Sequence, residues 1–588
     1  MSRIGLLQMD PTVGDLHNNS ERLAALAQLA EQEGAAVGVS TELAVCGYPP
    51  RDLLLEDDFI RRSLNTALSL ESSLPLLVGT PLPAEDERAL PTNGVVRCGP
   101  DSGSITGERG GRIVARKQLL PTYDVFDEAR YFAPDNRSGL ARSIGNLTLG
   151  VTVCEDAWQS AGKTPSSYAQ DPIEHIAEWC RQGVEIQATV NLSASPFHSE
   201  KANTRLEVAR HAASVLNHPF LLANQVGGND DLLFDGRSLV AWPDGRAVIA
   251  PSWQEGVLLV DLAGPEHCRW LPSHAEDALS IGQSGMIRLE AHQEAESEVD
   301  AIDEMTDAVV TGLADYCRKS NIGSIVLGLS GGIDSAVAAC VAAAAIGPSN
   351  VTSIAMPSRH SSQHSIDDAK HTGDALGLHH HVHPIDTMHG VSEEVLQDVL
   401  STGHAVAGEN LQARLRAIIV MAYANAQSSM AITTGNKSEI AQGYCTLYGD
   451  MAGGYAPLGD VYKMDVYAMA RRFNQRAKTA GLPPPVNDST LDKAPSAELA
   501  PDQFDEDTLP PYAELDEILK AHIEMGMNAD EMIASGHDAA KVKDVLTRLE
   551  RNEHKRWQMA PAPRISSRAF GQGWRRPLAS HHDWRDAR

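Results

Sequence analysis

The sequence predicts an α/β protein with at least two domains. The chain has 588 residues, whereas a single hydrophobic core rarely grows beyond about 250–300 residues. Apolar runs rich in β-branched residues alternate with amphipathic segments in both halves, which is typical of layered α/β folds. In the second half, the glycine-rich turn Gly328–Ser335 separates such a run from an alanine-rich segment. This arrangement indicates a buried parallel strand that leads directly into a helix.

Composition narrows the class of protein. The formal net charge of −29 disfavours a general binder of nucleic acid or membrane surfaces, because both need a basic field. The eight cysteines include no CxxC pair, so neither a disulfide framework nor a zinc ribbon is predicted. No signal-peptide core opens the chain, and the longest apolar run, Ala336–Ile346, is too short to span a bilayer. We therefore expect a cytoplasmic protein that acts on small molecules, without nucleic-acid or membrane partners.

Strands and helices alternate along the first half, where the amphipathic segment Asn18–Gly34 predicts the first helix. Strands are expected at Ile4–Met9, Ala36–Leu43, Leu76–Thr80, Arg112–Arg116, Leu147–Val153, Glu185–Asn191 and Pro219–Asn224. Asp244 and Gly245 supply the turn of a hairpin. Because the stretch from Leu262 to Asp303 shows no strong strand pattern, we expect domains at 1–270 and 302–588 and a linker at 271–301.

Three reactive side chains lie at the ends of predicted strands in the first half: Glu42, Lys117 and Cys154. A thiolate nucleophile needs a base that takes its proton and a cation that stabilises negative charge. Glutamate and lysine provide both without histidine. Taken singly, Cys154 is also compatible with a small buried apolar residue, and Glu42 and Lys117 with a surface ion pair.

The contexts of these residues together resemble the nitrilase/amidase superfamily, over roughly the first 270 residues. The resemblance implies an αββα sandwich with Glu42 as general base, Lys117 as the cation beside the oxyanion, and Cys154 as a nucleophile that forms a thioester. Glu128 matches a second glutamate that such enzymes place near the lysine.

Longer strings in the same region resemble the glutaminase half of the glutamine-dependent NAD synthetase family: Gly47–Leu54, Tyr123–Phe132, Asn191–Lys201 and Asn224–Asp230. This likeness implies that Tyr123, Ser195 and Lys201 hold the glutamine substrate. A phenol, a hydroxyl and an ammonium suit its carboxylate and amide groups. The alternative is ordinary loop polarity.

The glycine-rich turn of the second half predicts a phosphate cradle. Adjacent glycines allow backbone N–H groups to approach an anion, and the following helix adds the positive end of its dipole. No lysine follows as in a Walker A loop, so a different nucleotide chemistry is expected. An ordinary strand-to-helix turn with a solvated Asp334 is the alternative.

Further strands are expected at Val351–Met356 and before Thr434, with helices at Ile302–Lys319 and Ala417–Gln427. In an open α/β sheet, ligands bind where such strands end. Asp334 and Glu439 are candidate oxygen ligands for Mg²⁺. For Glu439, a favourable acidic position in a helix's first turn is the alternative.

The glycine-rich turn and the strings Thr434–Glu439, Lys493–Leu499 and Asp505–Tyr512 resemble the adenine-nucleotide α-hydrolase group. More specifically, they resemble the synthetase half of the same NAD synthetase family, over roughly residues 302–577. The resemblance implies a doubly wound parallel sheet. It implies ATP contacts at Gly328, Leu329, Ser330, Gly331, Gly332, Ile333, Asp334, Ser335, Thr434, Lys463 and Ser496. It implies deamido-NAD⁺ contacts at Asn410, Arg414, Glu439, His554 and Lys555. Leu447 and Gly454 depart from ammonia-using relatives, which tend to have a lysine and an acidic residue there.

The implied reaction is ATP-dependent amidation of deamido-NAD⁺ through an adenylylated intermediate, with ammonia from glutamine hydrolysis. It releases AMP, pyrophosphate and glutamate, and it implies Mg²⁺, a sheltered route for ammonia and a homo-oligomer. Two alternatives stay open: an ATP-pyrophosphatase amidotransferase with another acceptor, and a non-catalytic nucleotide sensor. Turnover of a different acceptor would favour the first, and absence of glutamine hydrolysis and pyrophosphate release the second.

Two polar stretches have simpler interpretations. The run His379–His383 is predicted to be a surface cluster, because it lacks cysteine or carboxylate partners at ligand spacing. Basic residues within Arg551–Arg556, with Arg575 and Arg576, are compatible with a C-terminal tail that closes over a diphosphate. They are a weak indication of nucleic-acid binding in an acidic chain.

Overall fold

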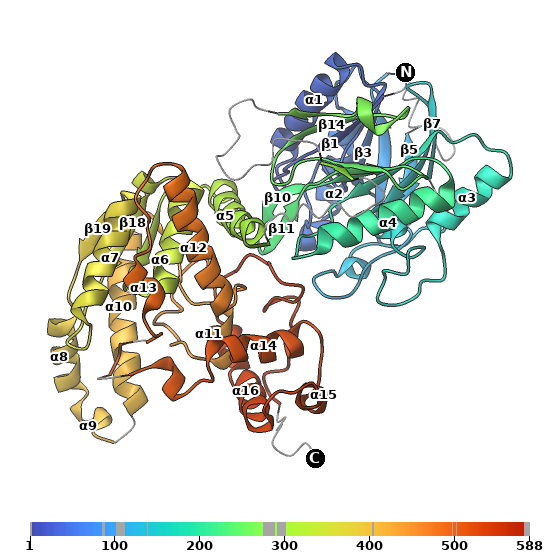
Figure 1. Cartoon of the computed structure of the whole chain (residues 1–588). Helices are drawn as coiled ribbons and strands as arrows, with labels where there is room; N and C mark the ends of the chain where they lie inside the picture. Colours follow the sequence, from blue (N-terminus) through green and yellow to red (C-terminus); the bar gives the residue numbers. More distant parts are fainter. Residues whose placement is uncertain are drawn as a thin grey trace. The chain divides into compact units, whose positions relative to one another are not determined.

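A computed structural model describes residues 3–84, 89–100, 112–137, 139–273, 288–290, 301–402, 405–496, 498–500 and 503–580. The chain divides into two compact units, Met1–Glu298 and Val299–Arg588 (Figure 1). Most of the stretch predicted as a linker, 271–301, lies outside the described residues.

Two seven-stranded sheets form the first unit. The first has the order β15-β14-β1-β2-β3-β4-β5, with strands at Arg269–Pro272, Gly256–Asp261, Arg3–Gln8, Val37–Val39, Leu76–Leu82, Thr92–Cys98 and Ile113–Arg116. The second has the order β16-β13-β12-β9-β8-β7-β6, with strands at Arg288–Glu290, Ala247–Ile249, Leu239–Ala241, Phe220–Asn224, Ala188–Ser193, Leu147–Val153 and Gly139–Ile144. A separate ribbon pairs β10 (Val226–Asn229) with β11 (Leu232–Asp235).

The two sheets bury one face against each other, and helices cover their outer faces. Leu6 and Val39 of the first sheet share a core with Val151 and Val190 of the second. Apolar residues of α1 (Leu16–Gln32) and α2 (Asp57–Leu68) pack on the first sheet. Those of α3 (Pro172–Arg181) and α4 (Lys201–Leu216) pack on the second. These layers are the predicted αββα sandwich.

The strands predicted in this unit are present, with two informative differences. The strand predicted at Ala36–Leu43 ends at Val39, because the chain turns there and Leu43 adopts a positive φ of 47°. The expectation of no strand between Leu262 and Asp303 is wrong at two places. Strand β15 pairs with β14, and β16, within the stretch predicted as a linker, pairs with β13.

The second unit is built on a four-stranded parallel sheet of order β19-β18-β17-β20. Its strands are His379–Val382, Val351–Ala355, Ile325–Gly328 and Met430–Ala431. The chain runs outward from β17 to β19 and then returns to β20 on the other side of β17. The carboxyl ends of β17 and β20 therefore meet at a topological switch point, where open α/β sheets bind ligands.

Helices cover the sheet and extend the unit. The helices that contact its strands or each other are α5 (Ala301–Lys319), α6 (Ile333–Ile346), α7 (Gln363–Leu376), α8 (Asp386–Val395), α9 (Gln397–Leu400), α10 (Ala405–Gln427) and α12 (Lys463–Thr479). Val326 and Ile354 pack against Val420 and Ala424 of α10. Helix α6 begins at Ile333, three residues before the predicted segment, and α10 begins at Ala405, so Asn410 and Arg414 are helical.

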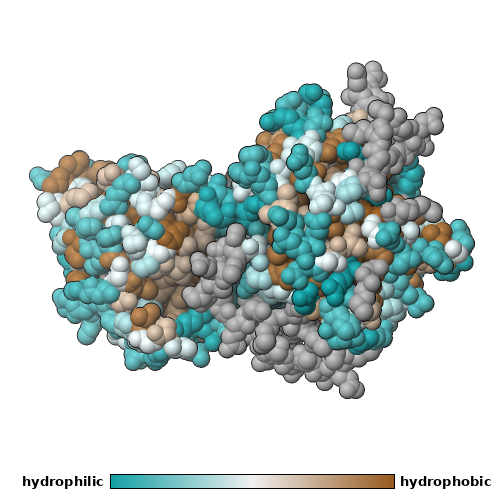
Figure 2. All heavy atoms as spheres, turned by 90° about the horizontal axis from the view of Figure 1, so that it is seen from above, coloured by the Kyte–Doolittle hydropathy of each residue, from teal (hydrophilic) through white to brown (hydrophobic). Residues whose placement is uncertain are grey.

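A second apolar cluster holds the C-terminal part of this unit together. It joins α11 (Lys437–Gln442), α14 (Tyr512–Ile523), α15 (Ala529–Ala534) and α16 (Ala539–Arg551) with Phe570 and Trp574 of the chain's end. The short helices α13 (Asp488–Asp492) and α17 (Glu553–Arg556) complete the set. Hydrophilic and hydrophobic residues are interspersed on the face shown in Figure 2. Among the described residues, no helix is long and apolar enough to span a membrane.

Candidate active sites

In the first unit, the predicted base, cation and nucleophile follow the ends of three strands. Glu42 comes after β2, Lys117 directly after β5, and Cys154 directly after β7. Lys117 Nζ lies 2.7 Å from Glu42 Oε1 and 2.8 Å from Glu128 Oε1. Glu42 and Lys117 have no solvent exposure, and Cys154 is 5% exposed. The structure thus brings three of the four predicted catalytic side chains into one buried ionic cluster, and the fourth, Cys154, interacts electrostatically with all of them.

Backbone and amide donors hold the Glu42 carboxylate in place. Asn93 Nδ2 donates to Glu42 Oε1 at 2.7 Å, and the Ala194 N–H donates to Oε2 at 3.1 Å. Gly79 of β3 lies against this turn so closely that an added Cβ would be 2.5 Å from the Thr41 carbonyl oxygen. The position of the base therefore depends on a glycine and an asparagine from neighbouring strands.

Cys154 occupies a sharp turn. Its φ is +42°, a left-handed value that is unusual for a residue with a Cβ, and Asn191 Nδ2 donates to its carbonyl oxygen at 3.2 Å. Burial raises the pKa of the Cys154 thiol and the charge of Glu42 raises it further, whereas Lys117 lowers it. The thiol therefore stays protonated until a base removes its proton during the reaction.

Asp156 joins the turn of the nucleophile to that of the lysine. Its Oδ2 accepts from the Val153 N–H at 3.0 Å, and its Oδ1 accepts from the Gln118 and Leu119 N–H groups at 3.0 and 2.9 Å. Burial raises the pKa of this carboxyl group to about 7, against the effect of these donors. A single side chain thereby ties together the ends of β5 and β7.

Two glutamates surround one lysine in this cluster. Burial alone would lower the pKa of Lys117, but the charges of Glu128 and Glu42 more than offset this and hold it well above its ordinary value. Burial raises the pKa of Glu128 to about 7, although Lys117 opposes the shift and the Tyr48 hydroxyl donates to Glu128 Oε1 at 2.9 Å. Lys117 is therefore always charged, and Glu128 titrates near neutrality.

Two of the residues predicted to hold glutamine gather beside the nucleophile. The Tyr123 hydroxyl donates to Glu155 Oε1 at 2.9 Å, and Lys201 Nζ lies 4.2 Å from the centroid of the Trp158 ring. Ser195 follows β8 and is buried, and its N–H donates to Asn224 Oδ1 at 2.9 Å. Burial raises the pKa of Glu155, whereas the charge of Lys201 lowers it.

In the second unit, the glycine-rich loop turns tightly after β17. Gly331 has a φ of +81°, and a Cβ there would lie 2.1 Å from the Ser365 carbonyl oxygen, so only glycine fits. Ser335 Oγ accepts from the Ser330 N–H at 3.1 Å, and Ser330 Oγ accepts from the Gly332 N–H at 3.2 Å. The Ser330 and Gly332 N–H groups therefore have partners within the loop, and the phosphate cradle stays a prediction.

Asp334 and Glu439, the two candidate metal ligands, converge on one ammonium group. Lys463 Nζ donates to Asp334 Oδ2 at 2.5 Å and to Glu439 Oε1 at 3.0 Å. Asn436 Nδ2 donates to Asp334 Oδ1 at 2.8 Å. Lys463 is also a predicted ATP contact, and its ammonium bridges the two acids.

A divalent cation at Asp334 and Glu439 stays a prediction, since the Lys463 ammonium already contacts both carboxylates. Burial raises the pKa of Glu439 to about 8, because the nearby charge of Lys463 offsets only part of the desolvation. A carboxyl group held in this way gains from additional positive charge. Within the described part of the chain, no three His, Cys, Asp or Glu side chains are grouped as a metal site. Two protein carboxylates are nevertheless the usual number for Mg²⁺, which also binds phosphate oxygens and water.

Two other predicted ATP contacts, Thr434 and Ser496, belong to separate segments of the second unit. Thr434 lies in the turn between β20 and α11. Ser496 Oγ accepts from the Glu498 N–H at 3.1 Å. Glu498 in turn accepts from Ser365 Oγ at 2.8 Å, and Ser365 is the residue that packs on Gly331.

Three of the residues predicted to contact deamido-NAD⁺ hold one loop. Thr446 Oγ1 donates to Asn410 Oδ1 at 2.7 Å, and Arg414 Nε donates to the Leu447 carbonyl oxygen at 3.2 Å. Lys555 Nζ donates to the carbonyl oxygens of Gly443 and Cys445, both at 2.7 Å. The structure therefore groups Asn410, Arg414 and Lys555 around residues 443–447.

The basic residues between 551 and 556 lie at the end of α16 and in α17. His554 is exposed and its Nδ1 lies 3.1 Å from the Arg551 carbonyl oxygen, within its own helical segment. Arg556 is buried and pairs with Glu553 at 2.7 Å. The final residues, 581–588, lie outside the described residues.

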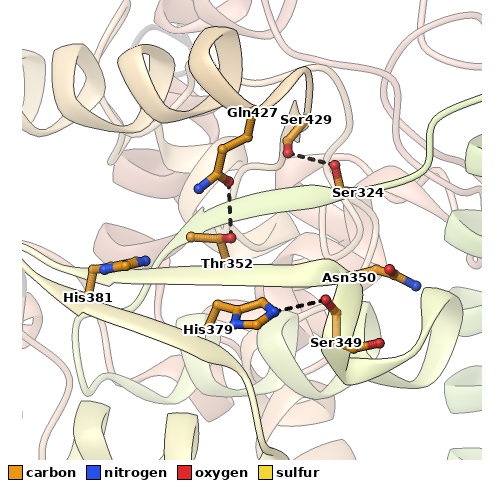
Figure 3. Close-up of a pocket in the computed structure, with 8 residues that line it drawn as sticks. All are labelled: Ser324, Ser349, Asn350, Thr352, His379, His381, Gln427 and Ser429. Atoms are coloured by element: carbon orange, nitrogen blue, oxygen red, sulfur yellow. Dashed lines mark hydrogen bonds between the residues drawn. The ribbon is translucent and has the colours of Figure 1, made fainter.

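A depression of about 340 Å³ opens at the amino-terminal ends of β17, β18 and β19, away from the glycine-rich loop (Figure 3). Gln427, Ser429 and His379 line it and make hydrogen bonds with Thr352, Ser324 and the Ser349 carbonyl oxygen. His379 and His381 belong to the histidine run, which forms β19 at the edge of the sheet. None of the predicted ATP or deamido-NAD⁺ contacts lines this depression.

Several residues of these sites escaped the sequence analysis: Asn93, Asp156, Glu155 and Asn436. Three of them have a local signal, since Glu155 and Asp156 directly follow Cys154, and Asn436 directly precedes the helix that carries Glu439. Asn93 has no such signal, because its contact with Glu42 depends on sheet pairing.

Comparison with known proteins supports both halves. The family model for NAD synthase matches residues 305–559, and that for carbon-nitrogen hydrolase matches residues 172–266, beyond Cys154. The glutamine-dependent NAD(+) synthetase of Rhodobacter capsulatus is 38% identical, covering 99% of both chains. That of Synechocystis is 37% identical, covering 98% of this chain and 99% of its own. The solved glutamine-dependent NAD+ synthetase of Acinetobacter baumannii, in complex with ADP, superposes with a TM-score of 0.70 at 28% identity over 98% of each chain. The chain belongs to the glutamine-dependent NAD(+) synthetase family.

Proposed function

We propose that this chain converts deamido-NAD⁺ to NAD⁺ with ATP and with ammonia that it releases from glutamine. The observation that carries the proposal is the buried Glu42–Lys117 ion pair beside Cys154. A structural cysteine needs no such pair, whereas hydrolysis of an amide by a thiol needs a base and a cation. The identity of the nitrogen acceptor, deamido-NAD⁺, is inferred from the similarity to the glutamine-dependent NAD(+) synthetase family.

In the first unit, Cys154 Sγ attacks the carbonyl carbon of the glutamine side chain while Glu42 takes the thiol proton. The ammonium of Lys117 stabilises the negative charge that develops on the carbonyl oxygen. Glu42 then gives the proton to the departing ammonia, which leaves a thioester on Cys154. Water, deprotonated by Glu42, hydrolyses this thioester and releases glutamate. Glu128 keeps Lys117 oriented throughout.

In the second unit, the deamido-NAD⁺ carboxylate attacks the α-phosphate of ATP and expels pyrophosphate. Ammonia then attacks the acyl carbon of the resulting acyl adenylate, and AMP leaves. The carboxylate needs this activation, because an unmodified carboxylate oxygen is a poor leaving group. The backbone N–H groups of the glycine-rich loop and the start of α6 would hold phosphate oxygens.

Mg²⁺, held by Asp334 and Glu439, would offset negative charge on the departing pyrophosphate. Thr434, Lys463, Ser496 and the loop Gly328–Ser335 would bind ATP, and Asn410, Arg414, Glu439, His554 and Lys555 would bind deamido-NAD⁺. A cytoplasmic homo-oligomer with small-molecule substrates completes the proposal, and light scattering would measure its oligomeric state. The acidic net charge of −29 supports the absence of nucleic-acid partners.

Incubation of the purified chain with ATP, Mg²⁺, glutamine and deamido-NAD⁺ tests the function. We expect NAD⁺, AMP, pyrophosphate and glutamate, quantified by chromatography. Turnover of a purine nucleotide, an amino acid or a tRNA base in place of deamido-NAD⁺ would identify a different amidotransferase. If neither glutamine hydrolysis nor pyrophosphate release is detected, a non-catalytic nucleotide sensor is the remaining alternative.

A further inference from the structure

We propose that Lys437 is a positioning residue of the synthetase reaction, through which the C-terminal segment Pro561–Phe570 holds the turn that carries Glu439. The inference rests on the proposed function of the second unit. Lys437 is a lysine with no solvent exposure, and it lies between Asn436 and Ser438 at the start of α11. A buried ammonium is costly unless it is fully paired, so its partners show what it holds together.

Those partners come from two distant parts of the chain. Lys437 Nζ lies 2.8 Å from Asp460 Oδ1 and donates to Ser566 Oγ at 2.6 Å and to the Arg568 carbonyl oxygen at 3.0 Å. The Tyr462 ring faces the ammonium with its centroid 4.6 Å away. All three donor positions of an ammonium are thereby used.

Asp460 fastens the same C-terminal segment a second time. Its Oδ2 accepts from the Ile565 and Ser566 N–H groups at 2.8 and 2.7 Å. The Ala456 N–H donates to the Pro561 carbonyl oxygen at 2.8 Å, and an added Cβ on Gly459 would lie 2.7 Å from Ala562 Cβ. The segment is therefore packed on residues 456–460, and Lys437 is the cation at the centre of that contact.

The residues on either side of Lys437 hold the acids of the reaction centre. Asn436 donates to Asp334, and Asn436 Oδ1 also accepts from the Glu439 N–H at 3.0 Å. Ser438 Oγ donates to Asp516 Oδ1 and accepts from the Lys463 N–H at 2.9 Å. Lys437 lies directly between Asn436, which contacts Asp334 and Glu439, and Ser438, which contacts Lys463. A displacement of Lys437 therefore displaces both neighbours and the three side chains of the reaction centre that they hold.

Lys437→Met tests the proposal, with Arg476→Met as the matched control. Arg476 pairs with Asp307 at 2.9 Å in the same unit, at the far end of α12 from Lys463. We measure ammonia-driven NAD⁺ formation, glutaminase activity and thermal unfolding, below the unfolding temperature of each variant. We expect Lys437→Met to lower kcat of synthesis about tenfold or more while glutaminase kcat and its KM for glutamine stay at the wild-type values. Arg476→Met should keep wild-type kcat.

Ser566→Ala removes the hydroxyl that accepts from Lys437 and donates to Asp460, and it leaves the direct Lys437–Asp460 pair in place. It should lower kcat in the same direction by a smaller factor, and it decides the question if Lys437→Met does not fold. Wild-type kcat in a folded Lys437→Met, or in Ser566→Ala when Lys437→Met is unfolded, would overturn the inference. Equal losses in Lys437→Met and Arg476→Met would also overturn it, since they would reflect stability alone. Failure of the wild-type chain to make NAD⁺ would instead contradict the proposed function.

Discussion

Lys463 Nζ lies 2.5 Å from Asp334 Oδ2, so the acid of the glycine-rich loop is paired with an ammonium from the start of α12. Asn436 occupies the other oxygen of the same carboxylate. These contacts bring together residues 102 and 129 positions apart in the chain. They explain how three separate strings of the sequence form one reaction centre.

Asp334→Ala should abolish synthesis from either nitrogen source. The change removes a carboxylate proposed to bind Mg²⁺ and leaves Lys463 with one acidic partner fewer. We expect ammonia-driven NAD⁺ formation to fall on the order of a hundredfold, with glutaminase activity unchanged. Asp465→Asn is the control, because Asp465 of α12 also pairs with a lysine, at 3.2 Å from Lys520 Nζ of α14. Substantial NAD⁺ formation by Asp334→Ala would remove Asp334 from the mechanism.

Gly331→Ala should disrupt the cradle. Alanine at a φ of +81° is strained, and its Cβ would collide with the Ser365 carbonyl oxygen. We expect a loss of about 1–3 kcal/mol in unfolding free energy and a marked rise in KM for ATP. In Gly323→Ala the added Cβ meets no atom within 4 Å, so this control should behave as wild type. Equal KM values for ATP in the two variants would argue against a phosphate site at the loop.

Glu128 predicts a pH dependence of glutamine hydrolysis. With a pKa near 7 in the folded chain, Glu128 loses its charge as the pH falls through neutrality. Protonation leaves Lys117 attracted to Glu42 alone, which weakens Glu42 as a base. The rate should therefore rise from pH 6 to pH 8, whereas Glu128→Gln should be slow and lack this step. A rate independent of pH in the wild type would exclude this role.

The raised pKa of Glu128 should lower stability as the pH rises from 4.5 to about 7. Between the ordinary value of 4.5 and about 7, the folded chain holds a proton that the unfolded chain lacks. Because the folded state binds more protons there, the unfolding free energy falls as pH rises through this window and is level above it. Denaturant titrations of wild type and Glu128→Gln at pH 5 and pH 8 measure this contribution.

The sequence alone predicts the reactive residues of the first unit better than the residues that hold them in place. Glu42, Lys117 and Cys154 each stand at the end of an apolar run, so strand prediction also predicts their common edge. Asn93 supports Glu42 through a contact between strands, and no local pattern encodes that contact. Asp156 is visible beside Cys154, but its hydrogen bonds with the turn after β5 are not. Strand β2 is shorter than predicted for the same reason: the turn at residues 40–43 packs against Gly79 of the next strand, and no local pattern encodes that contact.

In the second unit, the sequence does not show which charged side chains pair with one another. The glycine-rich loop is visible because its backbone geometry requires particular residues. Lys463 carries no local sign that it faces two carboxylates, and the family likeness assigned it to ATP. In the first unit, strands β15 and β16 are short and lie beyond the last strong apolar run of that unit, so only their pairing with β14 and β13 defines them.

Cys154→Ala, assayed with glutamine and then with added ammonia, tests the division of labour between the two units most directly. Loss of the thiol removes the only nucleophile proposed for glutamine and leaves the second unit unchanged. We predict no NAD⁺ from glutamine and near wild-type NAD⁺ formation from ammonia. If ammonia does not restore NAD⁺ formation, or if Cys154→Ala still uses glutamine, the two-centre account is contradicted.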